Sequence, residues 1–138
     1  MLGHFRYRCR KCRGDSILNL TNTIVAGNFE TDGELNSPDI AGAVATADHN
    51  LVGNANGSTG IVNGVNGNIV GGTAGGPVIN ALLGPLQNNG GPTQTMALLA
   101  GSPAIGHADS RRAPATDQRG LPRIDELGEL TDIGAFEL

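Results

Sequence analysis

From Leu86 to Ile105 the chain reads LQNNGGPTQTMALLAGSPAI, a segment in which two clusters of turn-forming residues flank a short apolar run. The first cluster joins consecutive Asn, Gly and Pro residues, and the second is Gly101 to Pro103. Asn and Gly tolerate the left-handed backbone of tight corners, and Pro fixes the backbone of a turn. The apolar run, Met96 to Leu99, has the length of a short strand. The segment therefore predicts short strands joined by tight corners.

The composition favours the same architecture over a helical one. The 138 residues include 22 Gly, one Tyr, three Phe and no Trp. Each Gly inside a helix costs about 1 kcal/mol relative to Ala, so long helices are disfavoured. Because aromatic side chains are scarce, Val, Ile, Leu and Ala must form most of the core. Small aliphatic side chains suit closely stacked strands around a narrow interior.

A short aliphatic phrase followed by Gly recurs along the chain. The three occurrences, each with the Asn that precedes it, are Ile24 to Asn28 with Asn22, Leu51 to Asn54 with Asn50, and Ile69 to Gly72 with Asn68. The spacing is 26 residues from Gly27 to Gly53 and 18 from Gly53 to Gly71. An irregular period of this kind is typical of a solenoid with corner loops of varying length. We expect the phrases to pair in parallel, aliphatic over aliphatic, with stacked Asn amides at the corners.

Two further motifs lie near the C-terminus, TDQRG from Thr116 to Gly120 and DIGAFEL from Asp132 to Leu138. Together with the Leu86–Ile105 segment, they resemble the closing segment of the choice-of-anchor Q group of bacterial surface proteins, which is similar to adhesin β-helices. The resemblance spans residues 18–138. It implies an all-β fold, a right-handed parallel β-helix (solenoid) with short irregular coils and a C-terminal cap. The residues expected to have structural roles in that cap are Asp117, Arg119, Asp132 and Phe136.

This interpretation divides the chain into three parts. We expect a basic, poorly ordered or non-native segment at residues 1–17, β-helix coils at 18–84, and terminal coils with the cap at 85–138. The first 13 residues contain five basic residues and no acid, so the other 125 carry a net charge of −9 in a chain of net charge −4. An acidic body disfavours a nucleic-acid surface, and Phe5 and Tyr7 in the basic segment do not make a stacking platform.

The start of the chain shows no targeting signal. No apolar run of signal-peptide length follows Met1, and no segment has the apolar length of a membrane span. Because the family that the chain resembles lies outside the cell, we expect this chain to be part of a longer exported protein, extracellular or at the cell surface. Residues 1–17 look unable to seal the N-terminal end of the coils, which favours self-association through that end.

Two features invite a metal interpretation. Cys9 and Cys12 form a single CxxC motif, which supplies half of the ligands of a closed zinc site. We interpret the pair as incidental, with its oxidation state open. The second feature is a projecting loop within Phe29 to Ala47, whose acids can offer oxygen ligands to calcium. These acids are Glu30, Asp32, Glu34 and Asp39. We interpret this as a solvated loop and predict no metal site and no cofactor, with calcium as the alternative.

Charged residues near the C-terminus raise a catalytic alternative. Asp125, Asp132 and Arg123 are candidates to line a saccharide groove, because carboxylates with arginine recur in polysaccharide-cleaving enzymes. Glycoside hydrolysis requires two carboxyl groups about 5 to 9.5 Å apart, which spacing in sequence cannot establish. We favour a structural pairing of Asp117 with Arg119 and assign no catalytic residue. His107 stands where the resembled family more often has an acid and a glycine.

Two hypotheses for function follow. In the first, the chain is a non-catalytic extracellular surface module, the terminal coils and cap of an adhesin-like or stalk protein, and binds a surface glycan or protein through its corner loops. In the second, it is a fragment of a carbohydrate-active β-helix of the polysaccharide lyase or glycoside hydrolase kind. We prefer the first, because a sugar groove usually offers aromatic platforms. After residue 17 the only aromatic residues of the chain are Phe29 and Phe136.

Overall fold

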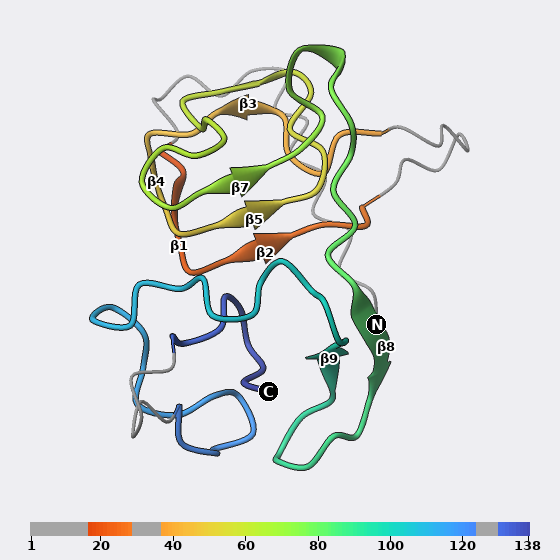
Figure 1. Cartoon of the computed structure of the whole chain (residues 1–138), viewed down its shortest axis with the longest axis vertical. Helices are drawn as coiled ribbons and strands as arrows, with labels where there is room; N and C mark the ends of the chain where they lie inside the picture. The colour runs from red at the N-terminus through yellow and green to blue at the C-terminus, as the bar shows by residue number, and fades with distance from the viewer. Residues whose placement is uncertain (1–16, 29–36, 124–129) are drawn as a thin grey trace.

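The computed structural model describes residues 17–28, 37–123 and 130–138, which form short strands joined by turns (Figure 1). The strands are β1 (Asn19–Thr21), β2 (Ile24–Val25), β3 (Gly42–Ala43), β4 (Thr46–Asp48), β5 (Leu51–Val52), β6 (Ser58–Thr59), β7 (Ile69–Val70), β8 (Leu83–Gln87) and β9 (Thr95–Leu98). A short 3₁₀ turn, η1 (Thr73–Gly75), follows β7. Among the residues described, no helix has the length and apolar character needed to span a membrane.

The repeated phrases form the centre of the fold. β2, β5 and β7 pair in parallel as a three-stranded sheet, next to the parallel pairs β1–β4 and β3–β6, whereas β8 and β9 form an antiparallel hairpin. The register partners are Ile24 and Ile69 for Leu51, and Val25 and Val70 for Val52. The predicted parallel pairing of the three phrases, aliphatic over aliphatic, is confirmed.

The expected stack of corner Asn side chains forms between Asn50 and Asn68 but not between Asn22 and Asn50. Asn50 is fully buried, and its side chain donates to Oδ1 of Asn68 at 2.9 Å and to the carbonyl of Leu20 at 3.0 Å. Its own Oδ1 accepts the N–H of Thr23 at 3.0 Å. In the first phrase, Thr23 therefore takes the position that we expected Asn22 to hold.

The prediction of a right-handed parallel β-helix is wrong. Among the described residues no sheet exceeds three strands, and parallel pairing ends with β7. On the outer edge of β7, the N–H of Val70 donates to Oδ1 of Asn63 at 2.9 Å, and the carbonyl of Asn68 accepts the N–H of Gly64 at 2.8 Å. These contacts occupy groups that another parallel strand would need, so the sheet stops there.

The core also differs from the single interior of a solenoid. Leu51 and Val52 are neighbours in β5, both fully buried, and they belong to different hydrophobic clusters. Since successive side chains of a strand point to opposite faces, the three-stranded sheet is covered on both sides. The buried partners of Leu51 are Ala81, Leu98, Ala104, Ala108, Ile133 and Phe136. Those of Val52 are Val44, Ala47, Ala55, Ile61 and Val70.

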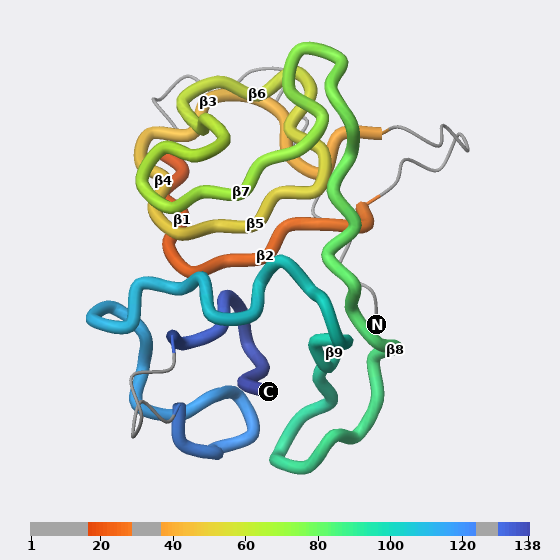
Figure 2. The backbone as a smooth tube through the Cα atoms, in the orientation of Figure 1, coloured from red at the N-terminus to blue at the C-terminus, as the bar shows by residue number. Residues whose placement is uncertain are grey.

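The C-terminal residues lie against β2, on the side of that strand away from β5 (Figure 2). Gly134 donates its N–H to the carbonyl of Asn22 at 3.1 Å. A Cβ added to Gly134 would lie 2.8 Å from Cδ1 of Ile24, so a side chain at this position is excluded unless the backbone moves. The tail therefore covers the first strand of the sheet.

Candidate functional site

Asp117 lies at the centre of a hydrogen-bond network, and its side chain is completely buried. Its Oδ1 accepts the N–H groups of Arg119 at 2.8 Å and Leu121 at 3.2 Å. Its Oδ2 accepts Nε of Arg119 at 2.7 Å and the N–H of Glu137 at 3.1 Å. The guanidinium of Arg119 also lies 3.6 Å from the centre of the Phe136 ring, a cation–π contact. Asp117 and Arg119 therefore pair, as the sequence led us to expect.

Arg123 belongs to the same region and is almost completely buried. It forms an ion pair with Glu137, in which NH1 lies 2.6 Å from Oε2, and it donates to the carbonyls of Asp132 and Gly134. The carboxylate of Asp132 points to the backbone and accepts the N–H of Gly106 at 2.7 Å. Arg123 and Asp132 thus lie together, but both are used in holding the chain.

The proposed saccharide groove is only partly within the described structure. Arg123 and Asp132 line a hollow of about 810 Å³ bordered by β2, the β8–β9 hairpin and the C-terminal residues. Asp125, the third candidate, lies outside the described residues.

The network shifts the pKa values of Asp117 and Glu137, each paired with an arginine, in opposite directions. Burial acts to raise the pKa of Asp117, but the hydrogen bonds from Arg119, Glu137 and Leu121 outweigh it and hold the pKa below its usual range. Burial raises the pKa of Glu137, and the negative charge of Asp132 adds to this effect, while the N–H of Asp132 and the Arg123 side chain oppose it. Asp117 is thus the acid whose charge the fold favours.

This separation predicts a pH-dependent effect of Asp117→Asn. At pH 7 the variant should be about 2 kcal/mol less stable than the parent, because the N–H groups and the Arg119 guanidinium lose a charged acceptor. Since the folded pKa of Asp117 is depressed, its stabilisation is complete above the unfolded value of about 3.9 and is lost as pH falls through the folded pKa. The free energies of unfolding of the parent and the variant should therefore become equal at low pH, which urea unfolding from pH 7 down to pH 2 measures.

Glu137→Gln is the matched control, because the folded pKa of Glu137 is raised. An acid whose pKa is higher in the folded state than in the unfolded state destabilises the fold as pH rises. The stability of the parent relative to this variant should therefore decrease as pH rises. Parallel pH profiles for the two variants would contradict the assignment.

Asp39 is the one acid of the calcium hypothesis that lies among the described residues. Its Oδ1 accepts the N–H of Asn28 at 2.6 Å, and its Oδ2 accepts the N–H of Asn54 at 2.7 Å. Burial raises its pKa, and the two N–H bonds act in the opposite direction. Asp39 therefore fastens two segments of backbone together. The other candidate metal ligands that fall outside the described residues are Glu30, Asp32, Glu34, Cys9 and Cys12.

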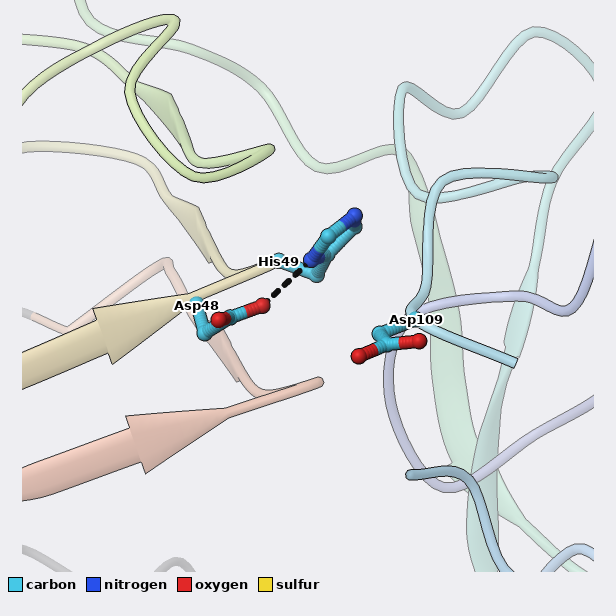
Figure 3. Close-up of side chains that lie close together, drawn as sticks. All are labelled: Asp48, His49 and Asp109. Carbon is cyan, nitrogen blue, oxygen red and sulfur yellow. Dashed lines mark hydrogen bonds and ion pairs between the residues drawn. The ribbon is translucent and has the colours of Figure 1, made fainter. Parts of the chain in front are cut away.

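The structure brings together a group that the sequence did not reveal, formed by Asp48, His49 and Asp109 (Figure 3). Each residue offers one ligand atom, and these atoms all lie within 4.8 Å of one another. Nδ1 of His49 lies 2.5 Å from Oδ1 of Asp48. Two carboxylates and an imidazole are donors that can hold a metal ion.

The corner after β4 fixes the position of His49. Its backbone is left-handed, with φ 50°, and its N–H donates to the carbonyl of Asn66 at 2.8 Å. The imidazole packs directly on Gly67, where an added Cβ would lie 2.5 Å from Cδ2 of the ring. Asp48 precedes it within β4 and pairs in register with Thr21. The left-handed corner and the absence of a side chain at Gly67 together place the ring.

Asn22 fixes Asp109 from the other side of the group. The Oδ1 of Asn22 accepts the N–H of Asp109 at 2.8 Å, and its Nδ2 donates to the carbonyl of Asp109 at 3.0 Å. Asn22 is itself left-handed, with φ 49°, and its N–H donates to the carbonyl of Asp48 at 3.2 Å. One side chain thus joins two segments that are 87 residues apart.

Two arginines compensate the negative charge of the group. NH1 of Arg112 lies 2.9 Å from Oδ2 of Asp48, and its Nε lies 3.5 Å from Oδ2 of Asp109. The more exposed Arg111 approaches Oδ1 of Asp109 at 3.4 Å. Burial acts to raise the pKa of Asp109, but hydrogen bonds from Arg111 and the charges of Arg111 and His49 hold it below its usual range.

Comparison with known proteins supplies no relative for this chain. No family model matches it, and neither the curated proteins nor the solved structures contain a match. The resemblance to choice-of-anchor Q surface proteins therefore stays a prediction.

Proposed function

We propose that the chain is a non-catalytic module of the extracellular or cell-surface space, which binds its ligand through the loops at its strand corners. The observation that carries this proposal is the internal use of the charged groups near the C-terminus. The carboxylates of Asp117 and Asp132 and the guanidinium of Arg123 are buried and hydrogen-bonded within the fold. A general acid or base must reach the proton that it transfers, so this arrangement supports a structural role for these groups.

The loops at the corners offer a surface of mixed character. A hollow of about 480 Å³ opens there, and its lining includes Thr46, Asn66 and Arg112. The side chains of Val62 and Val65 line the same hollow and are at least half exposed. Hydroxyl, amide and guanidinium groups hydrogen-bond to sugars and peptides, and the two valines add apolar contact. A surface glycan or a protein ligand is the partner that we propose.

The proposed function needs no resident cofactor. Calcium is the alternative for the acidic loop, although both carboxylate oxygens of Asp39 accept backbone N–H groups. Self-association through the N-terminal end also stays a prediction. The C-terminal residues cover β2 in part, and sedimentation velocity across a concentration series measures whether the remaining surface associates.

One observation favours a second candidate, a carbohydrate-active enzyme. The hollow lined by Arg123 and Asp132 has a volume in the range of small-molecule sites. In this alternative, Arg123 neutralises the carboxylate of a uronate, and Asp125 or Asp132 acts as the acid or base. It requires Arg123 to exchange its internal partners for a substrate.

Incubation with pectin, alginate and other acidic glycans separates the two candidates. We expect no release of unsaturated ends or reducing sugars. Turnover that disappears in Asp125→Ala would overturn the first proposal and establish the second.

Binding to a glycan array tests the corner loops themselves. Val62→Ser together with Val65→Ser should weaken binding to any glycan that the parent recognises, because both side chains line the hollow. Leu121→Ser is the matched control, since Leu121 is about half exposed and lies away from that hollow. Equal losses in the two variants would contradict recognition by these loops.

A further inference from the structure

We infer that Asp48, His49 and Asp109 form a binding site for a divalent transition metal of the zinc type, and that the metal displaces Arg112 from the two carboxylates. The inference goes beyond the proposed function, because ligand binding at the corner loops does not require a metal. It assigns a role to a group that brings together segments on opposite sides of β2.

The donor set selects the class of metal. Calcium and magnesium prefer oxygen ligands alone, whereas an imidazole suits zinc and its transition-metal neighbours. Three protein ligands with one position left for water are typical of open zinc sites. The combination of His49 with two carboxylates therefore points to zinc, cobalt or manganese and away from calcium.

The site needs only small side-chain movements to accept a metal ion. Nδ1 of His49 and Oδ1 of Asp48, now 2.5 Å apart, must open, and the more distant ligand atoms must close. Zinc holds nitrogen and oxygen ligands at about 2.0 to 2.2 Å, so the ligand atoms of a tetrahedral site lie roughly 3.4 Å apart. The three candidate atoms lie within 4.8 Å of one another before any metal is bound. In Figure 3, Nδ1 of His49 faces the two carboxylates, and side-chain rotation of Asp48 and Asp109 can bring the oxygens to it.

The backbone beneath the three ligands is already fixed. Asp48 is held by strand pairing with Thr21, His49 by its N–H bond to Asn66, and Asp109 by its two bonds to Asn22. Little conformational freedom of the main chain remains to be lost when a metal binds, which favours affinity. Side-chain movement alone completes the site.

The carboxylates of Asp48 and Asp109 already attract one cation, the guanidinium of Arg112. Its guanidinium contacts both carboxylates, but its side chain is 56% exposed. Ion pairs of exposed arginines contribute little stability, so the guanidinium can move into water at small cost. A divalent ion supplies two positive charges in place of the single charge of Arg112, while Arg111 stays beside Asp109.

Metal binding to the full chain tests this inference. The background variant is Cys9→Ser with Cys12→Ser, which removes the thiols that would otherwise bind zinc. We expect one Zn²⁺ per chain by isothermal titration calorimetry, and a visible absorption band when Co²⁺ is bound. Zn²⁺ should also raise the melting temperature, because it joins Asp109 to the β4 corner and binds only the folded state.

The variants are chosen to preserve the fold. His49→Asn keeps a residue that tolerates left-handed backbone, and Asp109→Asn keeps an acceptor for the N–H of Arg111. Each should weaken Zn²⁺ binding about tenfold or more, as loss of a ligand is at least as severe as loss of its supporting hydrogen bond. Arg112→Gln should tighten binding several-fold, because it removes the competing charge. His107→Asn, the matched histidine control, should bind as the background does.

Melting curves in EDTA establish that each variant is folded before its affinity is compared. Absence of Zn²⁺ binding in the thiol-free chain would overturn the inference. So would unchanged affinity in both His49→Asn and Asp109→Asn, or a loss in His107→Asn as large as that in His49→Asn. If one substitution unfolds the chain, Asp48→Asn provides a further ligand variant with the same expected loss.

Discussion

Replacing Asn50 with alanine should lower the free energy of unfolding by about 3 kcal/mol, a large part of the stability of a small domain. The side chain is fully buried and hydrogen-bonds to three other residues, Leu20, Thr23 and Asn68. Truncation leaves the N–H of Thr23 and the carbonyl of Leu20, both half-buried, without these partners, and each such group carries a desolvation penalty. Urea unfolding followed by circular dichroism measures the loss.

Asn88→Ala is the control for that experiment. Asn88 is exposed, and its side chain accepts one local bond, from the N–H of Gly90. We expect a change of less than about 0.5 kcal/mol, as for most surface substitutions. Similar losses at Asn50 and Asn88 would show that the corner amides do not hold the parallel strands together.

Arg123→Ala should destabilise the protein by about 3 to 5 kcal/mol, because it breaks a buried ion pair from one side. The substitution leaves Glu137 without its cation and the carbonyls of Asp132 and Gly134 without a donor. Arg111→Ala removes an ion pair whose arginine is 92% exposed and should change stability by less than about 0.5 kcal/mol. Chemical denaturation at pH 7 compares the two variants directly.

A double variant that keeps an apolar side chain at position 123 and removes both charges tests whether the ion pair itself is needed for stability. In Arg123→Met with Glu137→Gln neither charge remains buried, so we expect it to recover more than half of the stability lost in Arg123→Ala. The parent pair is imperfect, since Nε of Arg123 is buried without a hydrogen-bond partner. A double variant no more stable than Arg123→Ala would mean that the hydrogen bonds from Arg123 to the carbonyls of Asp132 and Gly134, and not the charge pair, stabilise this region.

The pairing of the strands could be predicted because the same short aliphatic segment recurs along the sequence. Ile24, Leu51 and Ile69 begin the same short phrase, and equivalent phrases bury the same side chains most easily when they stack in register. The identity of the corner residue was less secure, since Thr23 occupies the register position expected for Asn22. Repetition therefore revealed the partners but not every contact between them.

The fold class was mispredicted because a repeat does not show where pairing stops. The edge of β7 is blocked by Asn63, a residue that lies between phrases and has no counterpart in the repeat. The face of the sheet that carries Leu51 is covered in part by Ile133 and Phe136, which are more than 80 residues from Leu51 in the chain. Both effects are tertiary, and neither leaves a local pattern in the sequence.

Among the charged residues too, local contacts could be predicted from the sequence and tertiary contacts could not. Asp117 and Arg119 are two residues apart, so a turn brings them together and their pairing could be expected. Asn22 binds the backbone of Asp109 and holds it beside Asp48 and His49, and spacing in sequence gives no sign of that contact. The strongest metal candidate among the described residues was therefore invisible before the structure.

The position of the tail against β2 has a consequence for biosynthesis. During translation, Ile24 and Leu51 leave the ribosome long before Ile133 and Phe136, which complete the hydrophobic cluster around Leu51. One face of the central sheet therefore stays incompletely covered until the last residues of the cluster are made, an interval in which a nascent chain is prone to aggregate. Holdase chaperones would be expected to act on this protein until Phe136 has been made, on the face that the tail later covers.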